Sequence, residues 1–252
     1  PQTAPMQESD AGHSLMRRRP VLARFAAGLL AAIPISTPVQ AARILQTAPG
    51  DLSNVTLPGQ ICCLLDTDTR LVCPPDSQYY RLERGQILFS AQGAAPARWL
   101  MVGNVRLHLQ DRASAAVRLE SGRIEVTAVT GRVWIQGPSL AASSRTARWL
   151  RPGERLRFYA NGTCHRDHPD LDVILAWRDR RLIFQDRPLS DVVAEINRYE
   201  TRKITIAVGT VGSLRLSGVY YVGQSGSFVR ILPHLLPVHV TVSPHGTEIV
   251  PA

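Results

Sequence analysis

The chain has 252 residues, of which 44% are hydrophobic and 19% charged. This is enough apolar material for one large core or two modest ones, so the composition argues against a chain that is disordered throughout. Its formal net charge is +9, but the positive residues are spread along the whole length and Lys203 is the only lysine, so we expect no nucleic-acid partner. The cysteines lack the paired spacing of a zinc site. We predict that they are free, buried thiols; the alternative is a disulfide from Cys73 to Cys62 or Cys63.

An export pattern occupies the N-terminal part of the chain. Arginines at 17–19 precede an apolar run over 25–35, and Val39-Gln40-Ala41 offers the small-residue pattern that a signal peptidase reads. The alternative is a retained helix, because a bilayer is spanned by about 17 to 25 residues. Both interpretations stay open.

The arginines orient this segment, because positive residues remain on the cytoplasmic side of a membrane. We therefore predict a disordered cytoplasmic tail over 1–16, a transmembrane or signal segment over 17–42, and a body outside the cytoplasm from Arg43 onward.

The next part of the chain has the alternating pattern of β-strands. From about Leu52 to Phe158 apolar residues recur with period two, as in Val105-Arg106-Leu107-His108-Leu109 and Val133-Trp134-Ile135, and turn formers separate the runs. We predict a mainly β protein whose all-β domain, over 43–160, is a β-sandwich or jelly-roll.

A short motif repeats within this domain. Arg-Leu-Glu-Arg-Gly-Gln-Ile at 81–87 returns as Arg-Leu-Glu-Ser-Gly-Arg-Ile at 118–124, and 150–156 is a looser third version with a Pro-Gly turn. Because a glycine without side-chain restriction favours a tight turn, we predict that each copy is a hairpin with its turn at the glycine.

Residues 161–175 are polar and rich in turn formers, so we predict a linker. Within it, Cys164-His165-Arg166-Asp167-His168 contains metal-ligating residue types. A single such cluster in a linker is typical of a solvated loop, and we predict neither a metal site nor a cofactor.

Candidate catalytic residues are few. Asp66 and Asp68 would resemble an acid pair, but the surrounding Leu-Asp-Thr-Asp-Thr reads as turn chemistry. Ser225 lies in Gly-Gln-Ser-Gly, which lacks the spacing of a hydrolase nucleophile elbow. We therefore predict that the chain is not an enzyme.

The last segment, 176–252, predicts a small α/β domain. A short strand at Leu182 and Phe184 precedes a helix that Asp186 would cap and Pro188 would open, and Ile204 to Val208 reads as the returning strand. The apolar face of this helix is made by Leu189, Val192, Val193, Ile196 and Tyr199.

The same plan then repeats. Residues 214–220 read as a strand, and a second helix follows that Pro233 should keep short or kinked. The apolar residues assigned to that helix are Phe228, Ile231, Leu232 and Leu235, and those assigned to the closing strand are Val238, Val240 and Val242.

The stretch from Ala176 to Tyr199 resembles the C-terminal signature of the FecR family of iron-uptake regulators. Upstream, Val55-Thr56-Leu57-Pro58-Gly59 and Leu65-Asp66-Thr67-Asp68-Thr69 look like the opening of that family's central β domain. The two likenesses together cover nearly everything after Arg43. The residues that match the C-terminal signature are Trp177, Phe184, Pro188, Leu189, Asn197, Arg198 and Tyr199.

The resemblance implies a function. FecR-family proteins are single-pass inner-membrane anti-sigma proteins whose periplasmic part receives a signal from a TonB-dependent outer-membrane receptor, and whose cytoplasmic part controls an extracytoplasmic-function sigma factor. For this chain it implies an inner-membrane location, a periplasmic C-terminal part, and a sigma-factor partner bound through an N-terminal region missing before Arg17. A secreted or periplasmic binding module without catalytic activity is the alternative.

The C-terminal segment also resembles the short domains of secretins and of the receptors themselves. A small sheet with exposed edges can pair with a partner's strand through main-chain hydrogen bonds. We predict that the strand over 214–220 provides this edge; the alternative for each of Leu216, Val219 and Tyr220 is an ordinary core position. The predicted partner-binding residues are Leu214, Leu216, Val219 and Tyr220.

Overall fold

The structure is a computed structural model that describes residues 42–75, 79–93, 99–137, 149–207, 209–243 and 246–252, and these residues pack as one unit. The predicted tail and the export segment lie outside the described residues, apart from Ala42. None of the described helices is both long enough and apolar enough to cross a membrane.

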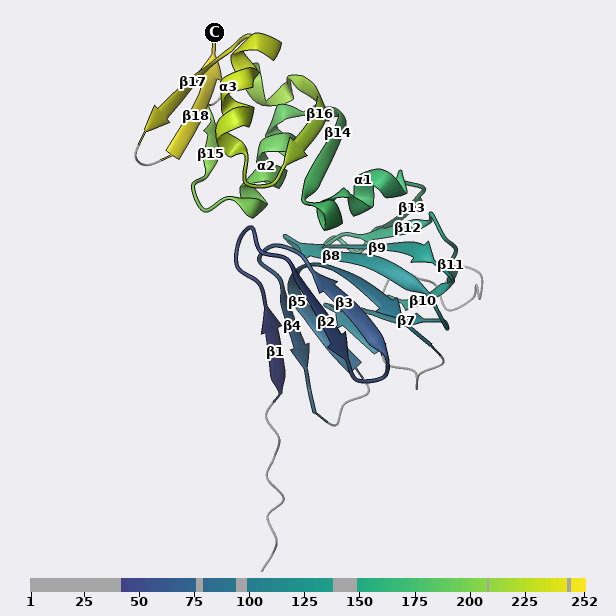
Figure 1. Cartoon of the computed structure of the whole chain (residues 1–252). Helices are drawn as coiled ribbons and strands as arrows, with labels where there is room; N and C mark the ends of the chain where they lie inside the picture. Colours follow the sequence, from purple (N-terminus) through teal and green to yellow (C-terminus); the bar gives the residue numbers. More distant parts are fainter. Residues whose placement is uncertain (1–41, 76–78, 94–98, 138–148, 208, 244–245) are drawn as a thin grey trace, which may run out of the picture. The chain divides into compact units, whose positions relative to one another are not determined.

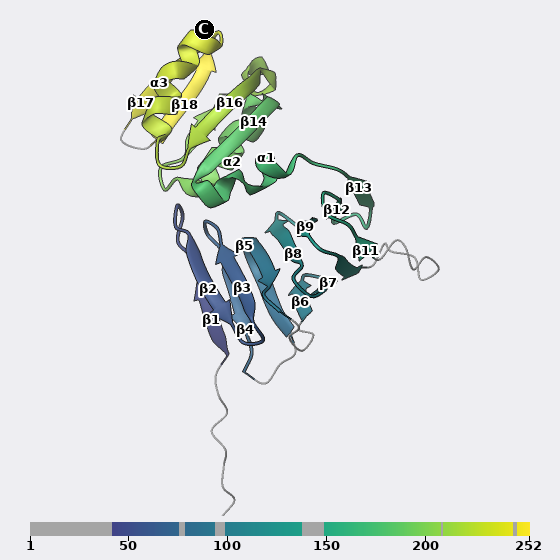
Figure 2. The same ribbon diagram turned by 45° about the vertical axis from the view of Figure 1, so that its right-hand side comes forward.

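Among the described residues, thirteen strands form one curled sheet, whose two halves share the long strand β5 (Tyr79–Ala91) (Figures 1 and 2). The first half also contains β1 (Arg43–Gln46), β4 (Arg70–Cys73), β6 (Trp99–Val102), β7 (Val105–Leu109), β10 (Val133–Gln136) and β11 (Trp149–Leu150). The second half also contains β2 (Ser53–Leu57), β3 (Ile61–Leu65), β8 (Ser114–Glu120), β9 (Arg123–Thr130), β12 (Arg155–Phe158) and β13 (Cys164–Asp167). The prediction of a mainly β protein is confirmed. In place of the two separate sheets of a β-sandwich or jelly-roll, the structure has one sheet that is continuous through β5.

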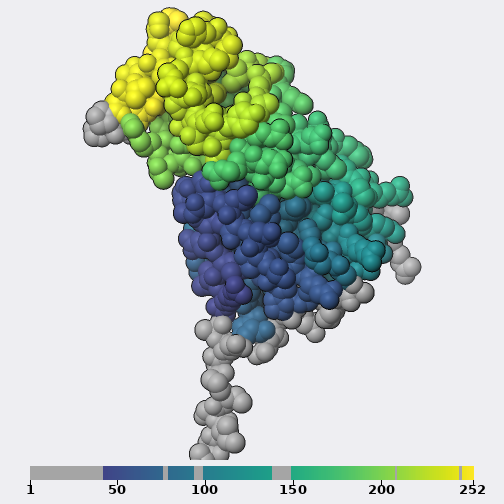
Figure 3. All heavy atoms as spheres, viewed as in Figure 1, coloured from purple at the N-terminus to yellow at the C-terminus, as the bar shows by residue number. Residues whose placement is uncertain are grey.

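Alternation of side chains builds the core between the two halves. In β7, Val105 and Leu107 are fully buried whereas Arg106 is exposed, as the period-two pattern predicts. The same rule buries Ile87 and Phe89 in β5, and these side chains belong to the same cluster as those of β7. Figure 3 shows the outer surface of one face, where the purple and blue atoms belong to the first strands of the sheet.

The first copy of the repeated motif is not a hairpin, because it lies inside the unbroken strand β5. Up to Arg84 this strand pairs with β4 and β6, and from Gly85 onward it pairs with β3 and β8. Gly85 has a φ of +91°, and a Cβ atom there would lie 2.6 Å from the Cα atom of Thr69. The glycine therefore allows β5 to bend from one half to the other rather than to turn back on itself.

The second copy is the predicted hairpin. Ser121 and Gly122 form a two-residue turn between β8 and β9, both with positive φ, as a type I′ turn requires. In the third copy the chain does turn at Pro152 and Gly153, but β11 pairs with β10 whereas β12 pairs with β9. That turn connects the two halves of the sheet and forms no hairpin.

The predicted linker is largely ordered as secondary structure. Within 161–175, β13 adds an edge strand next to β12, and α1 (Leu171–Leu175) follows with Asp170 as its N-cap. The polar side chains of this segment include Asp167, which accepts two hydrogen bonds from Arg155 and one from Arg157 of the neighbouring strand. A polar strand of this kind looks like a loop in the sequence.

The described part of the C-terminal segment contains two small sheets and two main helices. β14 pairs antiparallel with β16, while β15, β18 and β17 form a second sheet with β18 in the centre. The α/β class is confirmed, but the strands that flank each helix lie in different sheets. The elements are η2 (Ala176–Asp179), β14 (Arg181–Pro188), α2 (Leu189–Tyr199), β15 (Ile204–Ile206), η3 (Thr210–Ser213), β16 (Arg215–Tyr221), α3 (Ser225–Leu235), β17 (Val238–Ser243) and β18 (Gly246–Pro251).

The helices follow the predictions in part. All five predicted apolar residues of α2 are buried, but Asp186 does not cap it, because its carboxylate pairs with Arg215 and Pro188 occupies the N-cap position. In α3, Ile231 and Leu235 are exposed, because Phe228, Val229 and Leu232 make the buried stripe. Helix α3 has 11 residues and includes Pro233 near its end.

We predict that Gly85→Ala destabilises the protein more than Gly153→Ala. Both glycines have similar positive φ angles, but a Cβ atom at Gly153 meets nothing within 4 Å, whereas one at Gly85 collides with Thr69. We expect a loss of about 1–2 kcal/mol for Gly153→Ala from the backbone alone, and at least about 2 kcal/mol more for Gly85→Ala. Urea unfolding measures the free energy of unfolding of both variants. Equal losses would show that β5 does not require the close contact between Gly85 and Thr69.

Candidate functional site

The loop between β3 and β4 meets the end of α2 in a buried polar junction. Asp66 is only 1% exposed, and its carboxylate accepts a hydrogen bond of 2.7 Å from the hydroxyl of Tyr199. The guanidinium of Arg198 lies 3.5 Å from the same carboxylate oxygen. The two regions that carry the FecR-like residues thus contact each other through an aspartate and a tyrosine that are 133 positions apart.

Threonines fix the loop that presents Asp66. The hydroxyl of Thr67 donates to the carbonyl of Arg198 at 2.9 Å and accepts from the backbone N–H of Gly50 at 2.8 Å. The hydroxyl of Thr69 accepts from the backbone N–H of Gln86 at 3.0 Å, next to the bend at Gly85. The turn predicted at 65–69 is therefore present, and its buried side chains give it a second role that turn chemistry did not predict.

An alternating row of charges continues the junction along α2. Glu195 pairs with Arg118 of β8 at 2.7 Å and with Arg198 at 2.7 Å, and Arg118 also pairs with Glu120. The side chains of Glu195 and Arg118 are 17% and 20% exposed, so water screens these pairs only weakly. The row ties the helix to the sheet at a defined register.

An apolar contact lies beside this polar one. Leu52, Leu64 and Leu88 point away from the core of the sheet and pack against the core of the C-terminal segment. In β3 this makes both faces apolar, and the sequence Ile-Cys-Cys-Leu-Leu breaks the alternation seen elsewhere. That run is the sequence signal by which this contact could have been found.

The junction shifts the pKa values of its acidic groups in opposite directions. Burial raises the pKa of Asp66 to about 6, although Arg198 and Tyr199 lower it in part. Burial would also raise the pKa of Glu195, but Arg118 and Arg198 outweigh it and lower the pKa of Glu195 to about 2. Burial and then the charge of Asp66 raise the pKa of the Tyr199 hydroxyl, which therefore acts as a hydrogen-bond donor.

The other residues of the FecR-like signature have structural positions within the C-terminal segment. Trp177, Phe184 and Leu189 are buried in its core. The amide of Asn197 donates to the carbonyl of Ile204 at 2.7 Å and accepts from its N–H at 2.8 Å, so it joins the end of α2 to β15. Pro188 begins α2.

The predicted partner-binding residues divide between core and surface. Tyr220 is 5% exposed, and its hydroxyl donates to Glu200 at 2.8 Å. Val219 is 51% exposed, and Leu214 and Leu216 are half-buried. The neighbouring Tyr221, which was not predicted, is also 51% exposed.

The four cysteines are free thiols, of which Cys63 and Cys73 are buried, and burial raises the pKa of both. Cys164 and His165 lie in β13, and the nearest acid to His168 is Glu154 at 3.9 Å. Within the described residues, no three His, Cys, Asp or Glu side chains converge as metal ligands would.

We predict that Tyr199→Phe lowers the free energy of unfolding by about 1–3 kcal/mol, because it removes a donor from a buried carboxylate. Tyr221→Phe, at an exposed position, should change it by less than about 0.5 kcal/mol. Urea unfolding at neutral pH compares the two variants. Losses of the same size would mean that the hydroxyl of Tyr199 contributes nothing to the junction.

Asp66 should make folding stability depend on pH. Because its pKa is about 6 in the folded protein and 3.8 when unperturbed, folding takes up a proton between these values. The stability from this group is complete below pH 3.8 and is lost as the pH rises through about 6. Relative to Asp66→Asn, the wild type should lose about 2 kcal/mol between about pH 4.5 and 6.5, a window above the titration of Glu195.

Asp68→Asn is the matched control for this titration, because Asp68 lies two residues away and is exposed. It should follow the wild-type pH dependence. The assignment to Asp66 fails if Asp66→Asn retains the wild-type slope.

No protein-family model matches the chain, and no curated protein sequence matches it significantly, so the FecR resemblance rests on the residues quoted for it. Two crystal structures of a protein from Parabacteroides distasonis ATCC 8503, described as a candidate anti-sigma factor, have the same fold, each with a TM-score of 0.69 and 17% sequence identity. One comparison covers 84% of this chain and 100% of the neighbour, and the other covers 83% and 99%. This chain therefore shares its fold with the whole of these structures.

Proposed function

We propose that the chain is the envelope-facing part of an anti-sigma regulator. In this proposal it is held in the inner membrane by the segment over 17–42 and relays a signal from a TonB-dependent outer-membrane receptor to an extracytoplasmic-function sigma factor, in iron uptake. The sigma factor binds a cytoplasmic region that precedes the body described here.

The observation that carries this proposal is the fold that 84% of this chain shares with the whole of a protein described as a candidate anti-sigma factor. A fold alone hosts many functions, so the proposal needs support from particular residues. That support comes from the FecR-like residues: Asp66 from the β domain and Arg198 and Tyr199 from the C-terminal signature lie in one junction. A change in the C-terminal segment would reach the sheet through this contact.

The edge of β16 is the surface that fits the receptor's signalling domain. Val222 donates its N–H to the carbonyl of Arg180 at 2.9 Å, which makes this a hydrogen-bonded pair of the β14–β16 ladder. Because such pairs alternate along an antiparallel ladder, the N–H and C=O groups of Val219 and Tyr221 point away from β14. No described strand pairs with β16 on that side.

Exposed side chains accompany these outward-facing backbone groups, of which the carbonyl of Tyr221 already accepts from the N–H of Gln224 at 3.0 Å. Val219 and Tyr221 are both 51% exposed, so this edge offers main-chain hydrogen bonds together with apolar contacts. This combination suits the addition of a partner's strand, in which the backbone supplies affinity and the side chains supply specificity.

Val219→Pro is the sharpest test of this edge, because proline removes an N–H that the β14–β16 ladder does not use. Val242→Pro is the matched control: Val242 is 64% exposed and lies on β17, the edge strand of the other sheet. The N–H of Ala252 donates to the carbonyl of Pro237, and hydrogen-bonded pairs alternate along the β17–β18 ladder from that pair. The N–H and C=O groups of Val242 therefore point away from β18.

The measurement is co-purification of the intact regulator from detergent-solubilised membranes, with its partners identified by mass spectrometry. We expect wild type and Val242→Pro to retain both an outer-membrane receptor and a sigma factor, and Val219→Pro to lose only the receptor. Recovery of neither partner by the wild type would refute the regulator proposal. Loss of the receptor through Val242→Pro alone would move the binding edge to β17.

The same preparation tests the alternative of a released binding module. The N-terminal sequence of the membrane-bound protein should lie upstream of Phe25. Release of the whole population as a soluble product beginning near Ala42 would favour the secreted module.

A further inference from the structure

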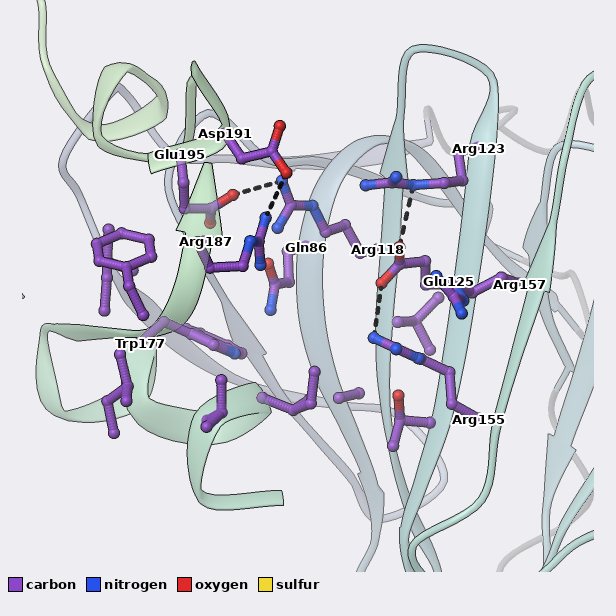
Figure 4. A pocket seen from close by; sticks show the side chains of 18 residues that line it. Gln86, Arg118, Arg123, Glu125, Arg155, Arg157, Trp177, Arg187, Asp191 and Glu195 are labelled. Atoms are coloured by element: carbon purple, nitrogen blue, oxygen red, sulfur yellow. Dashed lines mark hydrogen bonds and ion pairs between the residues drawn. The ribbon is translucent and has the colours of Figure 1, made fainter. Parts of the chain in front are cut away.

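A cavity of about 340 Å³ lies beside the junction (Figure 4). One wall is the outer face of β8, β9 and β12, and the other is built from α1, η2, β14 and α2. Its volume falls in the range of small-molecule sites, which is about 300–1,000 Å³. Neither the junction nor the edge of β16 accounts for it.

The register of the sheet brings arginines to one wall of the cavity. In β12, Leu156 and Phe158 are buried in the core of the sheet, so Arg155 and Arg157 point to the opposite face. Arg157 is opposite Glu125 in β9, and Glu125 is opposite Arg118 in β8, so charged side chains form a row across three strands.

Positive charge exceeds negative charge at the β12 end of this wall. Three arginines share two carboxylates there: Arg155 pairs with Glu125 and Asp167, Arg123 with Glu125 at 3.0 Å, and Arg157 with Asp167 at 2.9 Å. On the opposite wall, Arg187 pairs with Asp191 at 3.4 Å, and both side chains are about half exposed. Arg118 is already held by Glu195 and Glu120.

Two residues that line the cavity each have a buried N–H donor without an acceptor among the described residues. These donors are the indole Nε1 of Trp177 and the Nε of Arg157. Trp177 is only 4% exposed, and Figure 4 shows its indole nitrogen turned toward the cavity. Buried polar groups in native proteins nearly always have partners, so two such donors in one cavity indicate a missing acceptor.

We propose that this cavity binds a small organic carboxylate. Its anionic group accepts hydrogen bonds from the unpaired donors of Arg157 and Trp177, and the surplus positive charge of the β12 wall favours an anion over a neutral molecule. Its apolar part lies against Val173, Ile174 and Ile183, which also line the cavity. This inference goes beyond the proposed function and does not depend on it.

The indole N–H signals report directly on this site. The chain has four tryptophans, so a ¹⁵N-labelled full chain gives four indole signals, and Trp177→Phe identifies the one from Trp177. Benzoate is the probe, because it joins a carboxylate to a flat apolar ring. Benzamide has the same shape without the charge and is its control, and inorganic phosphate tests a simple anion.

We expect benzoate to move the Trp177 signal in a saturable way while benzamide does not. Arg157→Gln and Trp177→Phe should each weaken benzoate binding at least about tenfold, as thermal-shift titration measures. Arg106→Gln, at an exposed arginine of β7, and Trp134→Phe, on β10, should leave it unchanged. Circular dichroism confirms that each variant is folded.

If phosphate moves the Trp177 signal as benzoate does, the anionic charge alone is sufficient for binding. If only benzoate moves the signal, contact with the apolar wall is also required for binding. The proposal is overturned if benzoate gives no saturable shift at about 10 mM, tenfold above a Kd of about 1 mM. Equal shifts with benzoate and benzamide overturn it as well, because the site would not select an anion.

Discussion

The bend of β5 at Gly85 is the constraint on which the other features depend. One strand serves both halves of the sheet because its backbone passes against Thr69 at a distance that leaves no room for a side chain. The same contact holds the loop in which Thr69 hydrogen-bonds to β5 and Asp66 faces outward from the sheet. Without the bend there would be two unconnected sheets and no fixed platform for α2.

The junction that this platform carries illustrates how buried polar groups contribute specificity. Taking Asp66, Glu195 and their arginine partners out of water has a cost that offsets much of their mutual attraction, so the pairs add little net stability. They do exclude alternative placements of α2, because a shift of one residue would leave a buried carboxylate without its donor. The leucines beside them supply the less specific apolar part of the same contact.

Sequence patterns predict those features of this fold that depend on local periodicity. The strands of the sheet, the buried stripe of α2 and the turn at Gly122 follow from alternation, helical spacing and glycine φ. Gly85 lies in a motif similar to that of Gly122, yet its role is set by Thr69, which is distant in sequence. The strand β13 resembles a loop in the sequence because its Asp167 is paired with an arginine of another strand. Asp66 is likewise buried against Tyr199, which is 133 positions away, so no local sequence pattern could reveal the junction.

The position of β18 at the centre of its sheet has a consequence for biosynthesis. This strand joins β15, to which it is parallel, and β17, with which it forms a hairpin, so neither neighbour has another partner among the described strands. A chain that emerges from the ribosome in the order of its sequence can complete the 13-stranded sheet early. The C-terminal sheet must wait until Gly246–Pro251 arrives, and until then β15 and β17 are open strand edges that need protection from aggregation.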